Sequence, residues 1–135
     1  MRVFLDANIL FSAAKSDGAV RQLIALLRVA RHESWIDGYV LEEARRNLAA
    51  KAPDGLRQLD AMVVGLRVAD AHPADATQRF AASLPEKDRP VLAAAVRLGC
   101  DALVTGDRSH FGALYGKVVA GVAIHSPRSL AEAVL

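Results

Sequence analysis

The chain contains 135 residues, of which 53% are hydrophobic and 24% charged, which excludes a disordered polypeptide and predicts a single domain over residues 1–135. The single cysteine, Cys100, excludes an internal disulfide and a cysteine-based zinc site, and it is typical of a protein of the reducing cytoplasm. No apolar run approaches the roughly 20 residues that cross a bilayer, so we expect neither a membrane segment nor a secretory leader. The formal net charge of +2 permits a polyanionic partner without requiring one.

Short apolar runs and amphipathic segments alternate along the sequence. The runs predict strands at residues 3–5, 34–36, 66–69, 102–105 and 118–124. Periodic apolar positions predict helices at residues 19–31, 39–51, 56–64, 75–82 and 86–98, and after Ser126. Pro90 falls in the first turn of the helix at 86–98 and Gly99 follows its last residue, as expected for a helix start and stop. Residues 106–116 are expected to form a loop.

Strands that alternate with helices indicate a mostly parallel sheet, because each crossover lays a helix over one face of that sheet. The sequence therefore predicts an α/β fold of three layers, with the sheet between two layers of helices. Ligands of such folds bind beyond the carboxyl ends of the strands. Asp6 directly follows the first predicted strand, and Asp107 follows the fourth after one glycine, so both are expected at this edge.

Further acidic residues are expected at the same edge. Asp88 opens a predicted helix, and Glu42 and Glu43 lie early on another. Each acid has an ordinary structural interpretation, such as a helix cap for Asp88 or a turn residue for Asp107. Asp6 fits such an interpretation least, because an ionised carboxylate that ends an apolar strand is costly unless it is paired or bound to a metal. Several carboxylates at one edge repel one another, and a divalent cation is the usual means of holding them together.

Helical geometry distinguishes the two glutamates. The apolar face of their predicted helix consists of Val40, Ala44 and Leu48. Glu43 flanks this face whereas Glu42 points further towards solvent, so Glu43 is the expected site residue. Asn47 lies one turn beyond Glu43, where its side chain could hold the Glu43 carboxylate.

Four segments of the sequence resemble the acidic segments of PIN-domain nucleases. They are the opening strand with its Asp-x-Asn turn, a helix that carries a glutamate, a third acidic segment, and a strand that ends in Thr-x-Asp, at residues 3–10, 40–44, 88–95 and 98–107. Phe111 and the Ser-Pro-Arg at 126–128 also fit the family pattern. The resemblance follows the family's order and spacing and covers essentially the whole chain.

This resemblance implies a five-stranded parallel sheet and a metal-dependent endoribonuclease. Many bacterial members of the family are VapC-like toxins of toxin–antitoxin pairs, and many form dimers. The resemblance therefore implies RNA as the substrate, an antitoxin as a possible partner, and a homodimer. The alternatives are an RNA-processing PIN nuclease outside a toxin pair, and a PIN module that binds RNA or protein without cleaving.

The predicted catalytic residues are four carboxylates. Asp6 is expected to be the central metal ligand, with Asp88 and Asp107 completing the metal shell. Glu43 is expected either to bind the metal or to orient the attacking water. Because oxygen-only ligands select hard cations, the expected cofactor is Mg²⁺ or Mn²⁺.

Neighbouring residues are expected to support these carboxylates and to bind substrate. Asn8 and Thr105 match family positions that support the acidic cluster, Asn8 at Asp6 and Thr105 at Asp107, with which it shares a strand face. His110 is a weak candidate for a general base, because water activated by a metal needs no histidine. The acidic cluster would repel RNA unless nearby cations guided the backbone, and the candidate residues are Lys87, Arg89 and Arg108.

Two predicted helices carry apolar residues that could remain exposed. The positions concerned are Val20, Ile24 and Leu27 in one helix and Leu56, Leu59 and Val63 in the other. They predict either an apolar surface for a second copy or an antitoxin, or simple burial in the monomer core.

Overall fold

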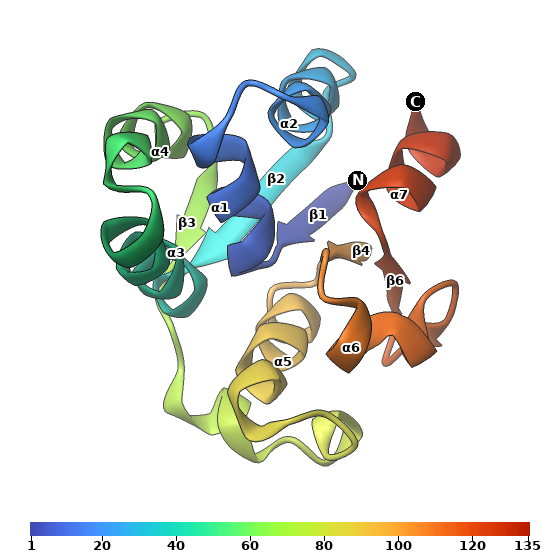
Figure 1. Cartoon of the computed structure of the whole chain (residues 1–135). Coiled ribbons are helices and arrows are strands. Elements are labelled where there is room, and N and C mark those ends of the chain that lie inside the picture. Colours follow the sequence, from blue (N-terminus) through green and yellow to red (C-terminus); the bar gives the residue numbers. More distant parts are fainter.

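The computed structural model describes all 135 residues around a six-stranded sheet with the order β3-β2-β1-β4-β6-β5 (Figure 1). Neighbouring strands are parallel except β5 and β6, which are antiparallel. The strands are β1 (Arg2–Leu5), β2 (Glu33–Asp37), β3 (Arg67–Ala69), β4 (Ala102–Val104), β5 (Val118–Val119) and β6 (Val122–His125).

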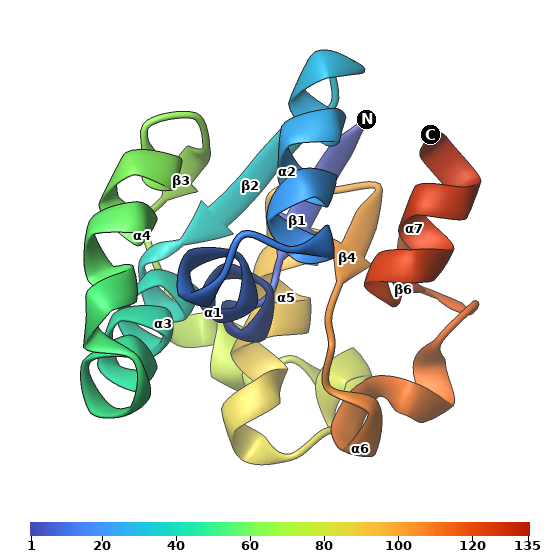
Figure 2. The ribbon, with the colours of Figure 1, turned by 45° about the horizontal axis from the view of Figure 1, so that its top comes forward.

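Helices cover both faces of the sheet. They are α1 (Ala7–Lys15), α2 (Ala19–Val29), α3 (Gly38–Lys51), α4 (Leu56–Val63), α5 (Arg89–Arg97), α6 (Arg108–Phe111) and α7 (Pro127–Val134). Single 3₁₀ turns occur at Pro53–Gly55, Pro73–Thr77, Arg79–Ala81, Glu86–Asp88 and Gly112–Leu114. Figure 2 shows α1 and α2 in front of the sheet and α5 behind it, which confirms the predicted three-layer α/β arrangement. None of the helices combines the length and the apolar composition needed to span a lipid bilayer.

Strand β1 lies at the point where the order of the sheet reverses. The chain passes from β1 to β2 and β3 on one side, and then returns to β4 on the other side. Val3, Phe4 and Leu5 are fully buried and pair with Ala102–Val104 of β4. Because the strands that follow β1 in the chain lie first on one side of it and then on the other, the carboxyl ends of β1 and β4 border a crevice, the usual ligand site of α/β sheets.

The sheet has six strands rather than the expected five. Residues 118–124, predicted as one strand, form the β5–β6 hairpin instead. Its turn contains Ala120 at φ 48° and Gly121 at φ 87°, both in the left-handed region that reverses the chain tightly. The five strands β1, β2, β3, β4 and β6 are parallel, and β5 adds a short antiparallel edge.

Four helical segments differ from the sequence prediction. Residues 7–15, for which no helix was predicted, form α1, where the Asp6 carboxylate caps the first turn by accepting from the Ala7 amide. The segment at 75–82 forms two separate 3₁₀ turns rather than one helix, and the helix at 86–98 begins with a 3₁₀ turn before α5. The expected loop at 106–116 contains α6, which is only one turn long and so leaves no periodic signal.

Candidate functional site

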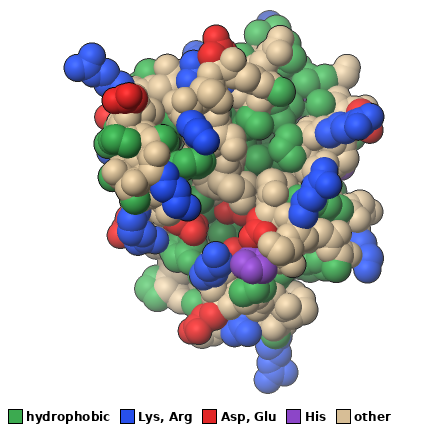
Figure 3. Space-filling model, viewed as in Figure 1, with side chains coloured by type: hydrophobic (Ala, Val, Ile, Leu, Met, Phe, Trp, Pro, Cys, Tyr) green, Lys and Arg blue, Asp and Glu red, His purple; other side chains and the backbone are tan.

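A cavity of about 400 Å³ opens at the carboxyl ends of β1 and β4, and Figure 3 shows acidic side chains gathered in this hollow. Its lining includes the four predicted carboxylates, Asp6, Glu43, Asp88 and Asp107. They come from the end of β1, the second turn of α3, the 3₁₀ turn before α5, and the residue that caps α6. The fold thus brings four acids from distant parts of the sequence into one cavity.

Asp6 is held more firmly than the other three acids. Its side chain is buried, at 4% exposure, and one oxygen accepts a 2.7 Å hydrogen bond from the Ala7 amide. The other oxygen accepts a 2.8 Å bond from the Thr105 hydroxyl and a 3.2 Å bond from the Asn8 amide group. Three donors therefore fix the Asp6 carboxylate before any ligand arrives.

The polar side chains around Asp6 form one network that joins β1 to β4. Asn8 lies beside Asp6 as expected, and its Oδ1 also accepts a 2.8 Å bond from the Gly106 amide. Thr105 was expected to position the carboxylate of Asp107, and this is wrong: its hydroxyl donates to Asp6 and accepts from the Asp107 backbone amide at 3.1 Å. Thr105 directly follows β4, and Asp6 directly follows the adjacent strand β1, so the two residues lie side by side.

Burial and mutual repulsion disfavour the charged forms of three of the acids. Burial raises the pKa of Asp6 to about 6, opposed by the hydrogen bond from Thr105 and reinforced by the nearby charges of Glu43 and Asp88. The pKa values of Glu43 and Asp88 are also raised, in both cases chiefly by burial. Lys87 and His110 offset this negative charge only in part, and a bound cation would relieve the rest.

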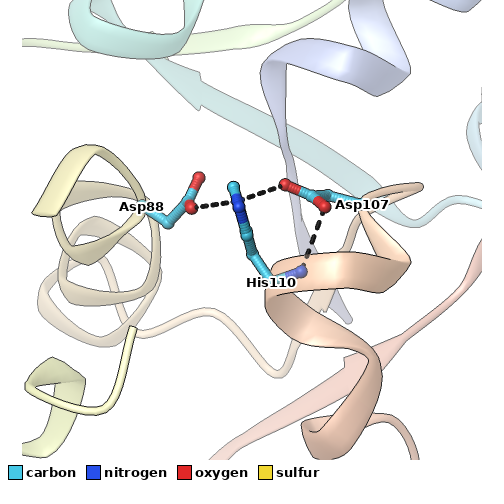
Figure 4. Close-up of side chains that lie close together, drawn as sticks. All are labelled: Asp88, Asp107 and His110. Atoms are coloured by element: carbon cyan, nitrogen blue, oxygen red, sulfur yellow. Dashed lines mark hydrogen bonds and ion pairs between the residues drawn. The ribbon is translucent and has the colours of Figure 1, made fainter. Parts of the chain in front are cut away.

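His110 lies between two of the carboxylates (Figure 4). Its Nδ1 atom is 2.7 Å from Oδ2 of Asp88 and 2.8 Å from Oδ2 of Asp107. Burial alone would raise the pKa of Asp107, but hydrogen bonds from the His110 backbone amide and the Ser109 hydroxyl outweigh it and lower that pKa. His110 was a weak candidate in the sequence because water activated by a metal needs no histidine, and residues 106–116 were expected to form a loop. A helical turn there places position 110 beside position 107, and that spacing was the available signal.

The two glutamates of α3 occupy different surroundings. Glu43 is half-buried and lines the cavity, whereas the Glu42 side chain is 78% exposed and pairs with Arg46 at 3.8 Å. Asn47 also lines the cavity, but no hydrogen bond joins it to Glu43, so the expected support of that carboxylate is absent. The structure places Glu43 in the site and Glu42 outside it.

The three candidate RNA-binding cations lie in different places. Lys87 lines the cavity, and its backbone carbonyl accepts a 2.6 Å bond from the Tyr39 hydroxyl. Arg108 is exposed on α6, outside the cavity. Arg89 is directed elsewhere, because its guanidinium donates to the carbonyl oxygens of Leu84 and Ala82. Only Lys87 is therefore brought to the carboxylates.

The donor atoms of the cavity fit a divalent cation. Oδ2 of Asp88 and Nδ1 of His110 are buried and have no partner with hydrogen-bond geometry, although they lie close together. One donor atom each from Asp88, Asp107 and His110 lies within 4.8 Å of the others. Buried polar atoms without such partners are rare in folded proteins, and convergent carboxylates without a cation are unfavourable. Asp88 and Asp107 supply the carboxylates of this group, and Asp6 lines the same cavity without belonging to the group.

Comparison with known proteins shows which family and which solved structures this chain resembles. A family model described as the PIN domain matches residues 2–109, a range that contains all four acids. No curated protein matches the sequence. Among solved structures, the fold is similar to VapBC2 from Rickettsia felis bound to a promoter DNA fragment, with 17% identity over 93% of this chain and 98% of that chain and a TM-score of 0.67.

Two further solved structures share the fold. VapBC-1 from nontypeable Haemophilus influenzae is 13% identical over 95% of this chain and 99% of that chain, with a TM-score of 0.64. VapC20 from Mycobacterium tuberculosis, described as a toxin that cleaves the sarcin-ricin loop, is 16% identical over 79% of this chain and 92% of that chain, with a TM-score of 0.58. These identities show likeness of fold alone, while the family model covers most of the sequence. The chain belongs to the PIN domain family.

Proposed function

We propose that this protein is a divalent-metal-dependent endoribonuclease and the toxin of a toxin–antitoxin pair. The observation that carries the proposal is the convergence of Asp6, Glu43, Asp88 and Asp107 in one cavity at the switch point of the sheet. A purely structural role does not account for it, because burial raises the pKa values of three of these acids. Membership of the PIN family and the toxins among proteins of similar fold support the same reading.

Each side chain has a separate task in the proposed reaction. Asp6, Asp88 and Asp107 hold Mg²⁺ or Mn²⁺, which when bound supplies a Lewis acid for the scissile phosphate and the attacking water. Glu43 orients that water and accepts its proton, a task that suits a half-buried carboxylate with a raised pKa. Lys87 at the cavity wall binds a phosphate of the RNA backbone.

Cleavage of RNA is the first test of this proposal. We expect the purified protein to cut RNA internally when Mg²⁺ or Mn²⁺ is present and to stop when EDTA is added. Attack by water leaves a 5′-phosphate and a 3′-hydroxyl, which end-labelling and mass spectrometry of the fragments distinguish. Cleavage that survives EDTA, or fragments with a 2′,3′-cyclic phosphate, would show metal-free acid–base chemistry and contradict the proposal.

A second surface supports the toxin assignment. A groove of about 590 Å³ lies between α2 and α4, away from the acidic cavity. Leu27 and Leu59 of the two predicted apolar stripes are fully buried, so the stripes belong mainly to the core. The apolar wall of the groove includes side chains beside and beyond these stripes, among them Val29 at 79% exposure and Val64 at 87%. Arg21, Arg28 and Arg67 also line it.

A groove with an apolar wall and three arginines fits a partner helix whose apolar face is flanked by acidic residues. We assign this groove to the binding of the antitoxin. The protein encoded beside this chain is expected to bind, and the paired change Val29→Asp with Val64→Asp should weaken that binding at least tenfold in calorimetry. RNA cleavage without the partner should remain unchanged. Val118→Asp is the matched control, because Val118 is 68% exposed on β5 and outside the groove. Equal binding by the paired variant and the control would exclude the groove.

A homodimer is part of the same proposal. Light scattering of the isolated chain is expected to give twice the chain mass of 14.4 kDa. A monomer at high concentration would remove the homodimer and leave the groove for the antitoxin alone.

A further inference from the structure

We infer that His110 is a nitrogen ligand of the metal site, so that this site binds transition-metal ions such as Mn²⁺ in preference to Mg²⁺. The inference rests on the proposed metal dependence. It adds one ligand atom, the imidazole nitrogen of His110, which would make the site bind Mn²⁺ more tightly than Mg²⁺. Imidazole nitrogen suits first-row transition metals, whereas Mg²⁺ prefers oxygen alone. The four carboxylates by themselves do not distinguish the two ions.

The position of the imidazole carries the inference. Nδ1 of His110 lies 2.7 Å from Asp88 Oδ2 and 2.8 Å from Asp107 Oδ2, and Figure 4 shows it between the two carboxylates. Ligand atoms at right angles around one ion are about 3 Å apart when each bond is about 2.1 Å long. The three donor atoms are therefore spaced like ligands of a single ion.

The contact between the His110 imidazole and the Asp88 carboxylate also supports a shared metal ion. Nδ1 of His110 and Oδ2 of Asp88 are both buried, and although they lie 2.7 Å apart, the contact does not have the angles of a good hydrogen bond. The Asp88 side chain is only 10% exposed, so water does not readily take that role. An imidazole that served only to bridge two carboxylates would direct an N–H at one of them. The close approach of the two atoms without that geometry is the arrangement expected of two ligands of one ion.

The surrounding fold fixes the ring in this place. Asp107 caps α6 through its other oxygen, Oδ1, which accepts from the backbone amide of His110 at 3.1 Å and leaves Oδ2 towards the ring. The next residue, Phe111, is fully buried and anchors the single turn of α6 in the core. A side chain held this firmly costs little entropy when it binds a ligand.

Electron spin-echo spectroscopy of bound Mn²⁺ tests the inference without RNA. The whole protein loaded with Mn²⁺ alone is expected to show coupling to a directly bound ¹⁴N nucleus, and His110→Asn should lose it. Asparagine places an oxygen or nitrogen near the position of Nδ1 without an imidazole, and circular dichroism checks that the variant folds. His72→Ala is the matched control, because His72 is exposed and outside the acidic cavity.

Calorimetric titration gives an independent readout. We expect His110→Asn to weaken Mn²⁺ binding at least tenfold and to change Mg²⁺ binding less than about threefold. No ¹⁴N coupling in the wild-type protein, or tighter Mn²⁺ binding in His110→Ala, would overturn the inference and make His110 an internal cation that competes with the metal. Absence of Mn²⁺ binding would overturn it too. RNA cleavage with Mg²⁺ is measured separately. The protein can therefore prove to be a nuclease although His110 binds no metal, and His110 can prove to bind Mn²⁺ although the protein does not cleave RNA.

Discussion

Replacing Asp6 by asparagine is expected to abolish RNA cleavage while stabilising the metal-free protein at neutral pH. The wild-type carboxylate must ionise in a buried place, where its pKa is about 6 rather than 3.8. That difference of about two pKa units costs the fold roughly 3 kcal/mol at pH 7.5. Asparagine removes this cost but loses one or two of the three hydrogen bonds to Asp6, each worth about 1 kcal/mol. The net gain should be about 1–2 kcal/mol.

The pH dependence identifies Asp6 as the cause. A carboxyl with a raised pKa binds its proton more tightly when folded, so its contribution to stability is lost as pH rises from 3.8 through about 6. The advantage of Asp6→Asn should therefore shrink by about 1.5 kcal/mol between pH 7.5 and pH 5 in urea denaturation with EDTA present. Saturating Mn²⁺ should reverse the order, because the metal is expected to bind the wild-type protein more tightly than the variant and so to stabilise it more. An equal loss of stability at both pH values would contradict a charged, uncompensated Asp6.

Replacing Glu43 by glutamine should reduce kcat/KM for RNA at least a hundredfold, whereas Glu42→Gln should change it less than about twofold. Glu43 lines the acidic cavity, and glutamine keeps its shape while removing the charge that we propose orients and deprotonates water. Glu42 lies on the same helix with its side chain 78% exposed, so it controls for any effect on α3 itself. The measurement is single-turnover cleavage of one labelled RNA at saturating metal.

Two outcomes of this comparison would contradict the predicted role of Glu43. Loss of activity in Glu42→Gln alone would mean that the active conformation rotates α3 relative to the structure described above. Full activity in both would assign the chemistry to the three aspartates and leave Glu43 as a helix charge. Thermal unfolding of both proteins is the control, because a surface glutamate should change stability by less than about 0.5 kcal/mol.

The fold could be predicted where the signal is local and periodic. The strand at residues 3–5 and the helices at 39–51 and 56–64 were found within two residues of their ends, because each presents a regular apolar face. The predictions failed where other constraints decide the backbone. A hairpin at Ala120 and Gly121 depends on two left-handed residues, and α1 depends on a cap that Asp6 provides while it also belongs to the site.

The acidic cavity was predictable in its carboxylates but not in its other donors. Position at a strand end or on a helix face depends on the local sequence, so Asp6, Asp107 and Glu43 could be placed beside one another. The roles of His110 and Thr105 depend on which oxygen of a neighbour each side chain reaches, and this is set by tertiary packing of α6 and β4. A one-turn helix carries no periodicity from which such contacts can be read.

The pairing of β1 with β4 also determines when an active molecule first exists during synthesis. Thr105 donates its hydroxyl to Asp6 across 99 residues of chain, and Asp88 and Asp107 come from the same late region. At about 5–20 residues per second, roughly 5–20 s of translation separate Asp6 from Thr105. Residues 1–69 already contain β1, β2 and β3 and can begin to pack, yet they hold only Asp6 and Glu43 of the cluster. A chain that stalls or is cut short of β4 therefore lacks Asp107 and the Thr105 hydroxyl that holds Asp6, so its acidic cavity is incomplete.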